Sequence, residues 1–198
     1  NFTLESSGNF TTSYSGDEGW WFATNKPSIV TLDGTVTYNG SDQQIGGNLT
    51  YNNLTILSQG TKTLNNDINV NGILDINPYN QYISTYATFD AQSYVVHGDG
   101  SISVGDYSTF ITSNPDGIDG VNVTSSQYSY IASNANFVFN GSGAQITGSL
   151  MPDQINDLTV DNTSTLTLSN SLICNNVNTA TDAQLIIPPG IGLTAQSY

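Results

Sequence analysis

The chain of 198 residues contains no arginine, and its two lysines, Lys26 and Lys62, face sixteen acidic residues, so its formal net charge is −14. Proteins that bind nucleic acid neutralise phosphates with clusters of lysine and arginine, which this chain lacks. The same deficit argues against attachment to anionic membranes. We therefore expect no nucleic-acid partner, and we expect the carboxylates to favour solubility and, where they converge, divalent cations.

Cysteine, histidine and long apolar runs are also scarce. Cys174 is the only cysteine, so no internal disulfide can form, and we expect it to be a small buried residue. His97 is the only histidine, which excludes multi-histidine metal sites. No apolar run approaches the roughly 20 residues of a membrane-spanning helix, so we expect no membrane insertion. The chain begins at Asn1 without a signal peptide, and we expect it to be a mature or excised piece of a longer protein.

What the chain does contain is a β pattern. Short runs alternate apolar and polar residues, as a strand with one buried face does, and they are separated by Asn-Gly, Asp-Gly and Asn-Pro turn dipeptides. The runs include residues 35–38, 53–57, 67–71, 101–104, 137–139, 157–161 and 165–169. No stretch has helical periodicity of useful length, so the fold class is predicted to be all-β.

One block of sequence occurs twice, at residues 34–76 and 135–177. Aligned by sequence, the copies match Gln44-Ile45 with Gln145-Ile146, and a turn widened by Met151-Pro152-Asp153 shifts the register of the later strands. The matched apolar positions, which we expect to point into one continuous core, are Leu54, Ile56, Ile68 and Val70 in the first copy and Leu158, Val160, Leu172 and Cys174 in the second.

A repeat that tolerates a turn insertion and keeps its strands is typical of a solenoid. We predict a single parallel β-helix over residues 1–198, with 1–30 the least repeat-like part; a β-sandwich is the alternative. Coils of roughly 20 to 25 residues would give about eight or nine turns, and asparagines at the corners could form ladders from coil to coil. Equivalent residues of the two copies should then occupy equivalent places in their coils.

The repeated pattern resembles the β-strand repeats of very large secreted surface proteins of Bacteroidota. Residues 34–76 and 135–177 carry it most clearly, and residues 98–118 also look like a recurring element of those proteins. The resemblance implies a parallel β-helical stalk or adhesin that is exported to the cell surface, often by the type IX route.

These observations predict a non-catalytic structural or adhesive segment of an extracellular, cell-surface or filament protein. Its expected partners are further copies, or a continuation of the same chain, joined end to end through strand edges. Pectin-degrading enzymes are also β-helical, but such lyases need a basic arginine or lysine, and the motifs of the related hydrolases are absent. The only glutamates, Glu5 and Glu18, lie in the least repeat-like region, so we predict no enzyme.

Calcium is the one cofactor that the sequence suggests. Asn114, Asp116 and Asp119 lie in Asn-Pro-Asp-Gly-Ile-Asp-Gly, where hard oxygen ligands could converge. Turn asparagines and aspartates also bond their own backbone, which is the structural alternative. The spacing matches neither an EF-hand nor the glycine-rich nonapeptide calcium repeat.

Aromatic residues suggest a different function, that of a carbohydrate-binding module for surface glycans, with or without calcium. Trp20 and Trp21 with Phe22, or Tyr82 with Tyr79 and Tyr86, could form a flat stacking platform for sugars. Packing within the coils is the alternative for any of these rings. A stalk should keep its aromatics inside, whereas a binding module should expose a line of them.

Overall fold

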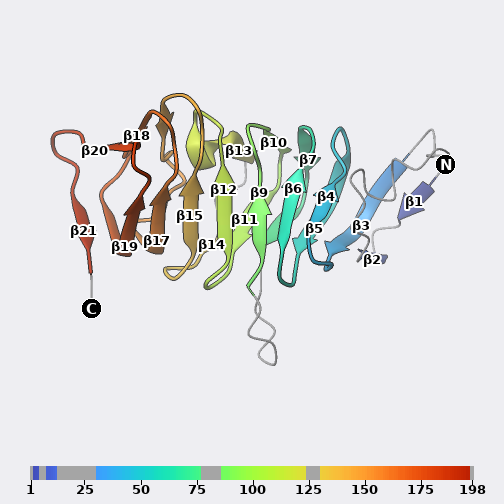
Figure 1. Ribbon diagram of the computed structural model, residues 1–198. Helices are drawn as coiled ribbons and strands as arrows, with labels where there is room; N and C mark the ends of the chain where they lie inside the picture. The colour runs from blue at the N-terminus through green and yellow to red at the C-terminus, as the bar shows by residue number, and fades with distance from the viewer. Residues whose placement is uncertain (1, 5–7, 13–29, 77–85, 124–129, 197–198) are drawn as a thin grey trace.

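The computed structural model describes residues 2–4, 8–12, 30–76, 86–123 and 130–196. Throughout these ranges the chain is all-β, and the only helical element there is a 3-10 turn, η2 (Gly117–Gly120). Figure 1 shows the strands stacked side by side along one axis, from β1–β3 at one end to β19–β21 at the other. The predicted parallel β-helix is confirmed, because every strand pair is parallel and joins one coil to the next.

The strands form three sheets that run along this axis. The 10-stranded sheet contains β1 (Phe2–Leu4), β2 (Asn9–Thr12), β3 (Val30–Tyr38), β5 (Thr50–Ile56), β7 (Ile68–Val70), β8 (Ile73–Ile76), β10 (Val96–Gly98), β11 (Ser101–Val104), β13 (Val121–Val123) and β14 (Tyr130–Ile131). The 8-stranded sheet contains β4 (Gln43–Ile45), β6 (Thr61–Leu64), β9 (Thr88–Asp90), β12 (Thr109–Thr112), β15 (Asn136–Phe139), β17 (Gln154–Val160), β19 (Leu172–Thr179) and β21 (Leu193–Ala195). The 3-stranded sheet contains β16 (Gln145–Ile146), β18 (Thr165–Thr167) and β20 (Gln184–Ile186).

Coil length changes along the stack. Leu54 in β5 pairs with Leu74 in β8, and Val160 in β17 pairs with Thr179 in β19, so the coils near both ends are short. In the middle, Ile76 in β8 pairs with Val104 in β11, and the stretch of chain between these two residues is longer than the stretch within either of the other two pairs. The predicted coil length therefore fits the two ends approximately and also the central pairing of Phe89 with Phe110, whereas the coil from Ile76 to Val104 is longer.

The core is the line of inward side chains along the whole stack. All eight residues predicted for it are at most 2% exposed, from Leu54 in β5 to Cys174 in β19. Alternation explains the result, because residues two apart on a strand point to the same face. Three phenylalanines stack on the inward face of the 8-stranded sheet. The ring centroid of Phe110 lies 5.8 Å from that of Phe89 and 6.0 Å from that of Phe137.

The two copies of the repeated block lie on different sheets. In the first copy, β3, β5, β7 and β8 belong to the 10-stranded sheet, and β4 and β6 to the 8-stranded sheet. In the second copy, β15, β17 and β19 belong to the 8-stranded sheet, and β16 and β18 to the 3-stranded sheet. The expectation of equivalent places in the coil is wrong in this respect: the inward direction is kept, but the block is shifted by one sheet around the axis.

The sequence alignment of the copies is also wrong by one residue at one corner. Gln43 pairs with Lys62, as Gln145 pairs with Leu166, and both glutamines are 2% exposed. Each accepts a backbone N–H, from Gly40 or Gly141, and donates to the carbonyl of a threonine in the preceding coil. The counterpart of Gln145 is thus Gln43 and not Gln44, because the second copy has one extra residue in this corner.

An asparagine ladder crosses three coils, as the composition suggested. Asn156 donates its side-chain amide to the side-chain oxygen of Asn136, and Asn175 donates to that of Asn156, both at 2.8 Å. Each side chain in such a ladder satisfies the next, so the ladder holds the coils in register.

Introducing a charge into the core should unfold the stack. We expect Val160→Asp, at a side chain that is 0% exposed, to cost about 3 kcal/mol or more, because a carboxylate would be buried without a partner. Thr159→Asp, on the outward face of the same strand, is the control and should change the melting temperature little. An equal effect of both substitutions on thermal unfolding followed by circular dichroism would contradict the assignment of faces.

Candidate functional site

Two of the three residues proposed for calcium, Asn114 and Asp119, use their side chains to bond the backbone. The backbone N–H of Asp116 donates to the side-chain oxygen of Asn114 at 2.9 Å, and the amide of Asn114 donates to the Ser93 carbonyl. The carboxylate of Asp119 accepts the N–H groups of Ser149 (2.6 Å) and Leu150 (2.9 Å) from the next coil. The structure thus brings Asn114 and Asp116 together and directs Asp119 to a different partner, and calcium binding stays a prediction.

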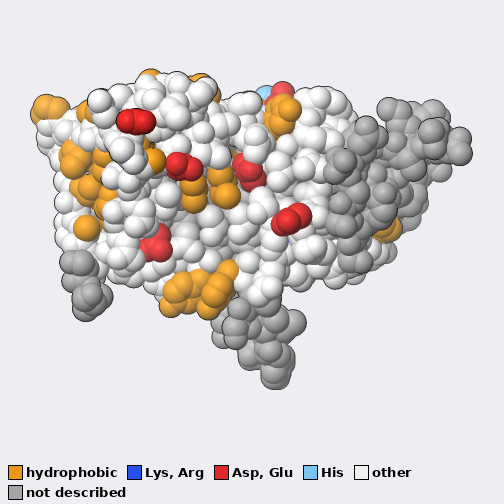
Figure 2. Space-filling view, viewed as in Figure 1, with side chains coloured by type: hydrophobic (Ala, Val, Ile, Leu, Met, Phe, Trp, Pro, Cys, Tyr) orange, Lys and Arg blue, Asp and Glu red, His pale blue; other side chains and the backbone are white. Residues whose placement is uncertain are grey.

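Other chemically active side chains are spread along the solenoid. His97 lies exposed on β10, beside Asn69 and Asn122 of the neighbouring coils, and Cys174 is buried in β19. Among the described residues, no three of His, Cys, Asp and Glu are grouped so that they could hold a metal ion. Figure 2 shows the carboxylates of one face spaced singly along the stack.

One lysine and one aspartate are buried, and a second aspartate is half-buried. Burial raises the pKa of Asp75 and of Asp90, and Asp90 also accepts hydrogen bonds from the backbone and side chain of Gln92. Lys62 is 0% exposed at an inward position that Leu166 occupies in the second copy. Its ammonium donates to three backbone carbonyls, those of Ser58, Gln59 and Gly60, at 3.0, 2.7 and 3.4 Å.

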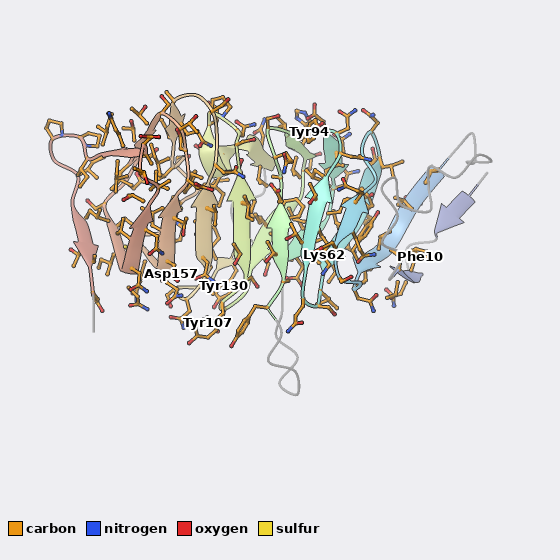
Figure 3. All side chains as sticks on the ribbon, viewed as in Figure 1. Phe10, Lys62, Tyr94, Tyr107, Tyr130 and Asp157 are labelled. Atoms are coloured by element: carbon orange, nitrogen blue, oxygen red, sulfur yellow. The ribbon has the colours of Figure 1, made fainter. Side chains whose placement is uncertain are left out.

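Three tyrosines are the large exposed aromatic residues of the described chain. Tyr86, Tyr107 and Tyr130 are 50%, 44% and 62% exposed, whereas the three stacked phenylalanines of the 8-stranded sheet are buried. The rings of Tyr86 and Tyr107 are 5.3 Å apart at an angle of 50°. Figure 3 places Tyr107 and Tyr130 at the same edge of the solenoid.

This tyrosine edge was only partly visible in the sequence. Tyr86 belongs to one predicted aromatic group, but Tyr82 and Tyr79, like Trp20, Trp21 and Phe22, lie outside the described residues. Tyr107 and Tyr130 were missed because alternation says nothing of residues at corners and strand ends. The available signal was Gly105-Asp106-Tyr107-Ser108, a turn sequence with an aromatic residue in it.

The last coil exposes apolar side chains of a different kind. Leu185 in β20 and Leu193 in β21 pack against the core but are only half-buried, and Ile186 and Ile187 are 43% and 45% exposed. Hydrophobic side chains accordingly gather at the end formed by β19–β21 (Figure 2). No helix in the described part of the chain has the length and apolarity needed to cross a membrane.

Comparison of the chain with protein-family models, with curated protein sequences and with solved structures finds no match.

Replacing Asp119 should reveal whether its role is structural. We expect Asp119→Asn to lower stability by about 1–2 kcal/mol, because the amide can replace only one of the two accepting oxygens. The loss should be equal with and without millimolar calcium in thermal unfolding. Asp116→Asn, at an exposed side chain, is the control. A melting temperature that rises with calcium in the wild type and not in either variant would establish the calcium site instead.

The buried lysine should give stability a distinctive dependence on pH. Burial lowers the pKa of Lys62 to about 8, with Asp42 acting in the opposite direction, whereas an unfolded lysine has a pKa of about 10.4. Between these values the unfolded state binds the extra proton, so stability should rise with pH from about 8 towards 10.

Urea unfolding at several pH values, in the wild type and in Lys62→Leu, checks this expectation. Lys62→Leu carries a leucine, as the second copy does at Leu166, and its stability should no longer rise with pH. Lys26→Leu removes the same charge, and if it removed the same rise, the effect would belong to net charge and not to the buried site.

Proposed function

We propose that this chain is a non-catalytic structural segment of an extracellular filament or surface protein, and that it extends by stacking coil on coil. The observation that carries the proposal is that the last coil leaves part of the preceding coil uncovered. In β17 the inward residues Leu158 and Val160 are fully buried. Their pairing partners in β19 are less covered: Val177 is half-buried, and Thr179 is exposed.

Strand edges at this end remain unpaired within the described chain. β21 pairs with residues 172–174 of β19, which leaves residues 175–179 of that strand without a following strand. β20 pairs only with β18. A bare edge with half-buried leucines behind it is a template for another parallel coil.

The occupant that fits best is a second copy of this chain, bound head to tail. At the opposite end, β1 and β2 pair only with β3 among the described strands, so their outer edges also lack a described strand. Because all coils run in the same sense, the strand edges of the last coil on one copy and of the first coil on the next have matching polarity. Such a heterologous contact repeats without closing, and it produces a filament.

Composition supports a non-catalytic role for this chain and a location outside the cell. Arginine is absent, histidine occurs once, and the chain is rich in asparagine, serine and threonine with a net charge of −14. The resemblance to secreted surface proteins of Bacteroidota supports the same location. The strongly negative charge also opposes lateral clumping of filaments at low salt.

Blocking the last coil should abolish assembly. We expect the wild type to form head-to-tail oligomers that grow with concentration, measured by sedimentation velocity and seen as filaments by electron microscopy. Leu193→Lys should leave a monomer, because a charge would have to be buried at the contact. Its melting temperature should stay close to that of the wild type, since Leu193 is only half-buried.

Ser142→Lys, in an exposed corner of a central coil, is the matched control and should assemble as the wild type does. A wild-type protein that stays monomeric up to its solubility limit would refute the proposal. Filaments that persist in Leu193→Lys would refute the assigned contact.

A further inference from the structure

We infer that the tyrosine edge formed by Tyr86, Tyr107 and Tyr130 is a binding site for neutral polysaccharide. The inference goes beyond the structural role, since this edge lies on the central coils and away from the last coil. It shares only Tyr86 with the aromatic groups that the sequence suggested, and different observations support it.

Tyr107 occupies a backbone conformation that disfavours it. Its φ is +58°, in the left-handed region that glycine and asparagine tolerate and that is an outlier for a bulky side chain. The other non-glycine residues with positive φ in the described chain are Asn48, Ser58 and Gln92, all polar. An aromatic side chain held in this conformation, with its ring exposed, indicates a role outside folding.

The corner that carries Tyr107 is held rigid by its neighbours. The N–H of Tyr107 donates to the carbonyl of Asn134 in the next coil at 2.9 Å, and the side-chain amide of Asn136 donates to the carbonyl of Tyr107 at 3.0 Å. Tyr86 packs against the ring from the preceding coil. The rings are therefore placed before any ligand arrives, which lowers the entropic cost of binding.

The spacing of the rings follows the spacing of the coils. Adjacent strands lie about 4.8 Å apart, and the Tyr86 and Tyr107 centroids are 5.3 Å apart. Tyr86 and Tyr107 form a pair of flat apolar surfaces with polar tips on adjacent coils, to which the apolar faces and hydroxyls of a sugar chain are complementary. In the next coil Asn134 lies beside Tyr107, and Tyr130, which pairs with Ser103, extends the aromatic surface along the same edge. Asp106, next to Tyr107 in the chain, and Asn134, whose carbonyl accepts the N–H of Tyr107, are half-buried and add polar groups at this corner for the sugar hydroxyls.

Charge selects a neutral ligand. Lys62 is the only lysine among the described residues, and it is fully buried. A phosphate, sulfate or uronate would therefore meet no exposed lysine or arginine on the described surface and would be repelled by a net charge of −14. A neutral polysaccharide is not repelled by this charge, and it binds through aromatic rings and hydrogen-bond acceptors.

Affinity electrophoresis tests the inference in native gels that contain a soluble polysaccharide. The neutral probes are dextran, laminarin, galactomannan and xyloglucan, with polygalacturonate and alginate as anionic probes. We expect retardation by at least one neutral probe and by neither anionic probe. The experiment uses the assembly-deficient Leu193→Lys background, so its outcome is independent of filament formation.

Tyr107→Asn separates binding from stability. Asparagine tolerates positive φ, so the variant should melt at the same or a higher temperature and bind about tenfold or more weakly. Ile146→Asn removes an equally exposed apolar side chain from β16 and should bind normally. The inference is overturned if no neutral probe retards the protein, if Tyr107→Asn binds as the parent does, or if that variant melts lower, which would make the ring a packing residue.

Discussion

The structure depends on one constraint: a short strand with a single apolar face becomes stable only when a neighbouring coil covers it. Each coil here contributes few buried side chains, and these meet the equivalent side chains of the coils before and after, as Phe110 meets Phe89 and Phe137. Stability is then the sum of contacts between neighbours and not the property of one compact centre. The same constraint explains why the last coil, with a neighbour on one side only, leaves leucine side chains half-buried.

Polar side chains inside the corners solve a second problem, because tight corners leave backbone N–H and carbonyl groups without strand partners. The two copies of the repeat solve it with different residues. In the first copy, buried Tyr38 and Tyr51 bond to the N–H and carbonyl of Gly46, and the ammonium of Lys62 bonds to three carbonyls. In the second copy, Leu166 replaces the lysine, and the amide of Asn162 reaches the Gly143 carbonyl, the Gln145 side chain and the Thr165 carbonyl.

Alternation was enough to predict the fold class and the inward residues, because the direction of a side chain on a strand is a local property. Leu54 and Val160 could be assigned to the core without knowledge of which strands they pair with. The sheet to which a strand belongs is not local: it depends on how many residues each corner takes, and one extra residue before Gln145 was enough to mislead the alignment with Gln43. The tyrosine edge was hidden for the same reason, since the φ of Tyr107 and its contact with Tyr86 arise from the stacking of two corners. The roles of Asn114 and Asp119 likewise required the neighbouring coils.

The shift of the repeated block by one sheet has a geometric consequence for any longer array. The distance between the copies is not a whole number of coils, so each recurrence of the block would begin at a new angle around the axis. A feature carried once per block, such as a pair of rings at a corner, would then follow a spiral path along a fibre and would face several directions in turn. Adding or removing a few residues at a corner would change the pitch of that spiral and leave the apolar interior as it is.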